Sequence, residues 1–216
     1  MPLLILGKDP SNYVKIDPTL SALRATTRPP ETSNKAWIHS SSKTGTLAAA
    51  TAGGSPLYCL QNMSTNLILV KRVKVCFSMI TWSNAQYADF GLMIHRNMTA
   101  TAPMTGGTPV LITGNNCKLF SEGGSISQIN CRVATTGTLT AGTRTADTYY
   151  LSQCGNNSTA VGSTIPLTTL FDAIPGKHPI VLVQGEGIEI QLITTLATGN
   201  TGVLGVTVEF AEAAYY

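Results

Sequence analysis

The strongest constraint on the fold of this chain is a two-residue alternation of apolar and polar side chains near its C-terminus. In residues 188–192, and again in 204–210, apolar residues occupy the even positions and polar or small residues the odd ones. Successive side chains of a β-strand point to opposite faces of a sheet, so this period predicts strands with one buried and one solvated face. It places Glu189 and Glu209 on solvated faces.

Further strands are predicted between turn residues along positions 37–216. The longest covers residues 67–82, in which the odd positions are mostly apolar: Leu67, Leu69, Val73, Val75, Phe77 and Met79. Lys71 breaks this pattern, which predicts a β-bulge or a strand end there. Shorter runs predict strands at 37–39, 56–60, 90–96, 110–113, 129–133 and 180–183.

About eight short strands separated by turns, with no sustained helical period, are typical of an antiparallel sandwich. We therefore predict an all-β, jelly-roll-like domain over residues 37–216.

Three stretches are assigned to connections. Gly185-Glu186-Gly187 predicts a tight hairpin turn before residue 188, because glycine adopts positive φ without steric cost. Residues 155–158, Gly-Asn-Asn-Ser, predict another turn. Residues 166–171 predict a helical turn or an irregular bridge.

Residues 1–36 differ from the rest of the chain and predict an extended N-terminal arm. Prolines punctuate a polar stretch without a period, and proline lacks the backbone donor that strands and helices need. Apolar anchors recur in it, and two placements remain open for them: a neighbouring subunit, or the arm's own domain. The predicted contact residues are Leu4, Leu6, Tyr13, Val14, Ile16, Leu20, Leu23, Arg24 and Arg28.

Charge is scarce in this sequence and is not clustered. Charged residues make up 12% of the 216 positions, and no basic run exceeds Lys71-Arg72. Nucleic-acid binding needs a clustered basic surface, so we expect no direct nucleic-acid contact. No apolar run approaches the roughly 20 residues of a membrane span, so we expect no membrane contact either.

No residue pattern indicates catalysis, a metal or another cofactor. His39, His95 and His178 lie far apart in the sequence, without metal-ligand spacing. The G-x-S-x-G motif that carries the serine nucleophile of many hydrolases is absent from the sequence. The five cysteines include no C-x-x-C pair, and without a recognisable secretory signal we expect reduced, packed thiols. We therefore expect no enzyme activity and no cofactor.

Six stretches, taken in their order along the chain, form a recognisable series. They are LRATTRPPE (23–31), LVKRVKV (69–75), LITGNNCKL (111–119), LTAGTRT (139–145), HPIVLVQGEG (178–187) and VTVEFAE (206–212). In this order they resemble a family of virion structural proteins from tailed bacteriophages and prophages. The resemblance implies a capsid cement or decoration protein with a jelly-roll body, but it brings no catalytic residues.

The same resemblance implies the partners and the location of the protein. Such proteins assemble as homotrimers, bind the major capsid protein, and lie on the exterior of a capsid that is assembled in the host cytoplasm. The alternative is a tail or head-fibre protein with a carbohydrate-binding jelly roll, because jelly rolls also occur in lectin domains.

Overall fold

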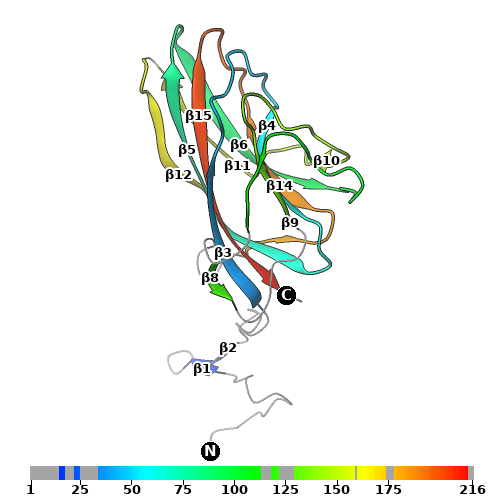
Figure 1. Cartoon of the computed structure of the whole chain (residues 1–216). Helices are drawn as coiled ribbons and strands as arrows, with labels where there is room; N and C mark the ends of the chain where they lie inside the picture. Colours follow the sequence, from blue (N-terminus) through cyan, green and yellow to red (C-terminus); the bar gives the residue numbers. More distant parts are fainter. Residues whose placement is uncertain are drawn as a thin grey trace, which may run out of the picture.

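A computed structural model describes residues 15–17, 22–24, 34–112, 118–121, 129–158, 160–173 and 178–213. All regular elements in these ranges are β-strands. All but the first two of them form two antiparallel sheets that pack face to face (Figure 1). The predicted all-β, antiparallel sandwich is therefore confirmed. In the described ranges, no helix has the length and apolar character needed to cross a membrane.

The strands follow one another closely along the chain. They are β1 (Lys15–Asp17), β2 (Ala22–Arg24), β3 (Asn34–Lys43), β4 (Pro56–Asn62), β5 (Leu67–Thr81), β6 (Gln86–Arg96), β7 (Thr108–Pro109), β8 (Lys118–Ser121), β9 (Ile129–Val133), β10 (Thr145–Ala146), β11 (Ser152–Ser158), β12 (Thr164–Asp172), β13 (Ile180–Leu182), β14 (Gly187–Leu192) and β15 (Thr201–Ala213). The first sheet has the order β12-β5-β15-β3-β8, with β13 also paired to β5. The second has the order β10-β6-β14-β4-β9-β7, with β11 also paired to β6.

The long strands of the sandwich pair in a nested order. β3 pairs with β15, β4 with β14, β5 with β12, and β6 with β11. The first half of the sandwich thus runs antiparallel to the second half, as in one long hairpin. Folding this hairpin over itself adds the pairs β5–β15 and β6–β14, which close the two sheets.

Because of this nesting, most connections cross between the sheets. The turn around Gly185, whose φ is 81°, joins β13 in the first sheet to β14 in the second. The predicted hairpin between these two strands is therefore wrong, although the predicted turn exists. Its geometry is local, whereas the partners of the two strands are chosen by distant residues.

Three other local predictions are also wrong. Residues 155–158 lie in strand β11 and residues 166–171 lie in strand β12, while residues 110–112 follow β7 outside any strand. β11 and β12 lack a clean alternation because each pairs with a single long strand and leaves much of its surface exposed. Backbone pairing along β6 and β5 holds them extended in spite of glycine, asparagine and proline.

The predicted irregularity at Lys71 is confirmed as a β-bulge. Glu209 pairs with Arg72 and Phe210 pairs with Val70, so Lys71 is the extra residue of β5. A bulge reverses the alternation that follows it. The main core therefore contains Ile68 and Val70, and the prediction that Leu67 and Leu69 share the face of Val73 is wrong; these leucines pack with Val181, Ala211 and Ala213 instead.

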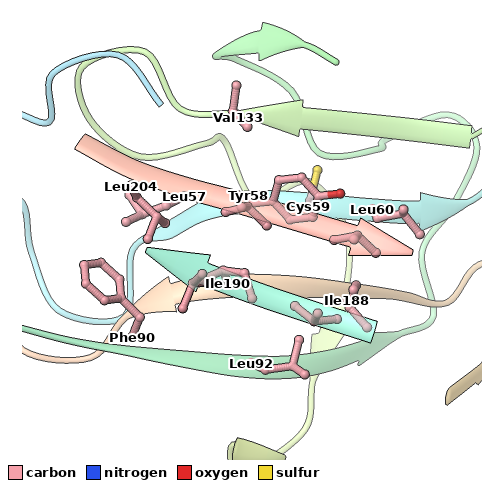
Figure 2. Close-up of a cluster of buried hydrophobic side chains, with 14 of the residues drawn as sticks. Leu57, Tyr58, Cys59, Leu60, Phe90, Leu92, Val133, Ile188, Ile190 and Leu204 are labelled. Atoms are coloured by element: carbon pink, nitrogen blue, oxygen red, sulfur yellow. The ribbon is translucent and has the colours of Figure 1, made fainter. Parts of the chain in front are cut away.

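The main core lies between the two sheets. Figure 2 shows side chains from both sheets meeting there, among them Tyr58, Phe90, Ile190 and Leu204, which are all fully buried. Phe77 and Phe90 bring a ring from each sheet into contact, with centroids 5.0 Å apart. Burying one such large apolar side chain stabilises the fold by about 1.5–3 kcal/mol, so the core is the main source of stability.

Candidate functional site

A buried polar cluster lies on the outer face of the second sheet, which an ordinary sandwich would expose to water. It comprises Gln61, His95, Asn130, Arg144, Tyr150, Glu189 and Gln191. Two connections cover it, residues 97–107 and residues 134–151, and they are joined by the backbone pairing of Thr105 with Thr140. Every residue of β14 is consequently buried.

The prediction that Glu189 lies on a solvated face is therefore wrong, since its side chain is fully buried. The alternation of residues 188–192 predicts one solvated and one buried face, but the covering connections bury both faces of β14. Glu209 differs, because its side chain is not fully buried. Its side chain keeps 26% exposure and accepts a hydrogen bond from Arg72 at 3.2 Å.

The Glu189 carboxylate makes a bidentate contact with the second covering connection, residues 134–151. Arg144 donates from Nε and Nη2 to the two carboxylate oxygens, each at 3.0 Å. Gln191 Nε2 donates to the same carboxylate, and the Tyr150 hydroxyl donates to Gln191 Oε1 at 3.0 Å. Buried charges persist when they are paired and hydrogen-bonded in this way, so these contacts pin residues 134–151 to β14.

The other half of the cluster holds the first covering connection. Gln61 Oε1 accepts hydrogen bonds from the backbone N–H of Met104 at 3.2 Å and from Asn130 Nδ2 at 2.6 Å. The Gln61 amide nitrogen therefore faces His95 Nε2, 3.3 Å away, and donates to it. His95 must accept at Nε2 and carry its proton at Nδ1, which has no hydrogen-bond partner among the described residues.

Burial keeps His95 neutral. It lowers the pKa of the imidazole to about 4, and the positive charge of Arg144 acts in the same direction. Glu189 would favour the protonated ring, but its Oε2 is 3.8 Å from His95 Nδ1, beyond hydrogen-bond distance. Because Arg144 already balances that carboxylate, burial dominates and the neutral ring is the stable form.

The cysteine on the same face is also unreactive. Burial raises the pKa of the Cys59 thiol well above its usual range, and a thiol must lose its proton to act as a nucleophile or a metal ligand. Among the described residues, Cys59, Cys76, Cys131 and Cys154 form no disulfide. The fifth cysteine lies outside the described residues.

This geometry makes the cluster a structural clamp rather than a reaction centre. Gln61, His95 and Glu189 are fully buried, so a ligand reaches them only if the covering connections move. No group of three or more His, Cys, Asp or Glu in the described ranges is arranged to hold a metal ion. The chemistry that remains is hydrogen bonding, which attaches two long connections to the sheet.

A separate depression of about 230 Å³ lies at one end of the sandwich. It is lined by Met63, Met98, Ala100, Gln184 and Gly185. None of these side chains is an acid, a base or a nucleophile, so the depression offers shape and thioether contacts but no catalytic group.

A line of alternating charges crosses the outer face of the first sheet. Arg72 donates to Asp172 at 3.1 Å and to Glu209 at 3.2 Å, and His39 Nδ1 lies 3.7 Å from Glu209. The hydrogen bond to Asp172, and then the charge of Glu209, raise the pKa of Arg72. Because these side chains are partly exposed, each pair contributes little to stability.

The predicted contact residues of the arm fall largely outside the described residues. Ile16 lies in β1 opposite Leu23 of β2, and Arg24 of β2 lies opposite Lys15. β1 and β2 form a two-stranded sheet of their own, drawn apart from the sandwich in Figure 1. The positions outside the described residues are Leu4, Leu6, Tyr13, Val14, Leu20 and Arg28. The sandwich begins at Asn34, where β3 starts to pair with β15.

Sequence reasoning did not find the buried polar cluster. The available signal was weak: Arg144 is the one charged residue between Arg132 and Asp147, inside a Gly- and Thr-rich stretch. Its partner Glu189 lies 45 residues away, and Gln61 and His95 are 34 residues apart. Local periodicity carries no information about such pairs.

Comparison with known proteins identifies no relative. No protein-family model, no curated protein and no solved structure matches this chain. Its function must therefore be inferred from its own fold, its surface and the six stretches of its sequence.

Proposed function

We propose that this chain is a structural virion protein of a tailed bacteriophage that acts as a capsid cement or decoration protein. It assembles as a homotrimer and binds the major capsid protein on the exterior of the shell. Many contacts, each modest in strength and repeated by symmetry, stabilise the shell together.

The observation that carries this proposal is the nested order of the long strands. Two Greek keys spread over two sheets of four strands define the jelly roll, which occurs in viral capsid proteins and lectins. The four nested pairs and their alternation between the sheets support such a body, with β7, β8, β9, β10 and β13 as additions.

The stretches that resemble phage virion proteins supply the framework of this body. Residues 69–75 contain the bulge of β5, and residues 206–212 lie in β15, which pairs with it. Residues 139–145 contain Arg144, which clamps a covering connection, and residues 178–187 contain the turn that crosses between the sheets. The likeness therefore concerns architecture, as a structural role requires.

The positions and hydrogen bonds of the buried polar side chains also support a structural role. Glu189, Arg144, Tyr150 and Gln191 hydrogen-bond to one another and hold a connection in place, whereas no acid, base or nucleophile lines the depression. A protein that works through its outer surface needs a rigid body of this kind.

Copy number in the virion tests the proposal. Quantitative mass spectrometry of purified virions should give a copy number that scales with that of the major capsid protein. A few copies per particle would instead place the protein in a tail or fibre. Purified protein should also sediment with capsids that lack it, and should raise the temperature at which those capsids disassemble.

Carbohydrate binding is the second candidate, because aromatic side chains project from the surface. Trp82, Tyr87 and Tyr149 are all exposed, and exposed aromatic rings can stack on sugars. A glycan array supports this candidate if one glycan binds and if replacing one of these rings by alanine abolishes the signal. Loss of the signal should not follow from replacing exposed Leu111 by alanine.

A further inference from the structure

One long stretch at the edge of the sandwich contains no charged residue. Between Asp147 and Asp172 the chain contains no Asp, Glu, Lys, Arg or His. This stretch, residues 148–171, includes β11, the turn after it and β12. These residues form the uncharged side of the sandwich.

The uncharged side is a continuous piece of the molecule, because it joins the edges of both sheets. β11 lies along β6 of the second sheet, and β12 lies along β5 of the first. Ser152 Oγ donates to the carbonyl oxygen of Leu170 at 2.6 Å, which links the two edge strands. The N–H of Gly162 donates to the carbonyl oxygen of Met79 at 3.2 Å and holds the intervening turn against β5.

Large apolar side chains project from this side. The exposed fractions are 83% for Tyr149, 48% for Leu151, 63% for Val161 and 58% for Leu167. Lack of charge alone does not cause this exposure: residues 44–70 are also uncharged and all described, yet they expose no large apolar side chain. Depletion of charge together with exposed apolar groups is the composition of an interface core.

Asp147 and Asp172, the acids that flank this stretch in the sequence, are both paired within the molecule. Asp147 accepts a hydrogen bond from Arg96 Nε at 3.3 Å, and Asp172 accepts one from Arg72 Nε at 3.1 Å. These ion pairs lie where the stretch begins and ends in the sequence. The charged residues beside it on the neighbouring strands are Asp89, opposite Gly155, and Lys74, opposite Thr169.

Strand addition does not suit this edge. β12 shifts register between Ile165 and Thr168 and again between Thr169 and Phe171, and Pro166 has no N–H to donate. Bulges and proline block an edge strand from extending its sheet into another chain. Contacts along β12 must therefore be made by side chains, with Leu167 presented from the first irregularity.

We propose that the uncharged side is the surface through which copies of this chain associate with one another. Around a rotation axis, residues close to the axis face their own copies, so a charge there meets a like charge. An edge whose own residues carry no charge and expose apolar groups reduces this repulsion. This inference rests on the self-assembly in the proposed function and names the surface that performs it.

The test compares two substitutions in the full-length chain. Leu167→Glu places a charge in the uncharged side, and Leu111→Glu places one on another exposed leucine, 75% exposed, outside it. Analytical ultracentrifugation over a concentration series should show a self-associating parent protein. Leu167→Glu should weaken association about tenfold or more, because it removes a buried apolar contact and adds a repeated charge. Leu111→Glu should leave association unchanged.

Further measurements separate misfolding from loss of contact. The two variants should share the parent's near-ultraviolet circular dichroism, and Leu167→Ser, which adds no charge, should weaken association less than Leu167→Glu. Hydrogen exchange in residues 160–171 should slow as parent concentration rises. A parent protein that stays monomeric, or equal weakening by both glutamate variants, overturns the inference.

Capsid binding distinguishes this inference from the proposed function. A monomeric parent that still binds capsids overturns only the self-association surface. An oligomeric parent that Leu167→Glu dissociates, and that never binds capsids, supports the surface and overturns the cement role.

Discussion

Acid should destabilise this protein through His95. The ordinary pKa of a histidine in an unfolded chain is about 6.5, whereas burial lowers that of His95 to about 4 in the folded state. Between these values the unfolded chain binds a proton that the folded chain does not. Stability is therefore complete above about pH 6.5 and falls as the pH decreases toward 4.

The size of the effect follows from the difference between the two pKa values. Each pKa unit corresponds to 1.36 kcal/mol, so His95 alone removes about 3 kcal/mol of unfolding free energy over this range. That is a large share of the roughly 5–15 kcal/mol by which single domains are stable. Because His95 is fully buried, solvent does not screen this contribution.

The hydrogen bonds around His95 predict where the structure opens first. When the His95 ring gains a second proton, that proton is on Nε2 and points at Gln61 Nε2, which is also a hydrogen-bond donor. Rotating the Gln61 amide relieves that conflict but turns its NH₂ group toward the N–H of Met104 and the amide of Asn130. The first arrangement sets two donors against each other, and the second loses the hydrogen bond that attaches Met104 of residues 97–107.

The assay is urea unfolding at a series of pH values from 4 to 8. His95→Gln keeps an acceptor for Gln61 and removes the titrating group, so its stability should fall less than that of the parent below pH 6.5. His39→Gln, at a side chain 42% exposed, controls for loss of a histidine in general. The reasoning is refuted if parent and His95→Gln show the same pH dependence. It is also refuted if the protection factor of the Met104 amide, which corrects for the slower intrinsic exchange at low pH, is no lower at pH 5 than at pH 7.

Four further perturbations test other parts of the structure. Arg144→Ala leaves a fully buried carboxylate without its partner and should cost about 3–5 kcal/mol in urea unfolding; a loss below about 1 kcal/mol would show that the pair is not needed. In Gly91→Ala the new Cβ would lie 2.3 Å from a tyrosine ring, so we expect a loss of about 1–3 kcal/mol by thermal unfolding, whereas Gly137→Ala, with no described atom within 4 Å, should be nearly neutral. Ser40→Ala removes a buried hydroxyl without a hydrogen-bond partner among the described residues and should raise the unfolding free energy by about 1 kcal/mol; a decrease would mean that the hydroxyl has a partner after all. Deletion of residues 1–30 should abolish virion incorporation and leave the melting temperature of the isolated protein unchanged, and the opposite result would assign the arm to its own domain.

Much of the strand content was predictable from local sequence. Alternation at residues 188–192 and 204–210 is a property of neighbouring residues, because it reflects which side chains share one face of a strand. The interruption at Lys71 was visible for the same reason. Its consequence for Leu67 and Leu69 was not, because the direction in which a bulge shifts the faces depends on the partner strand.

Only the tertiary structure decided which strands are buried on both faces and which segments form the edge strands. Glu189 is dry because Arg144 and its connection lie over it, and β11 and β12 are extended because β6 and β5 pair with them. These contacts join residues tens to more than a hundred positions apart, and their free energy depends on three-dimensional proximity. A two-residue period specifies that a segment can form a strand, but it does not specify what will lie on either side of it.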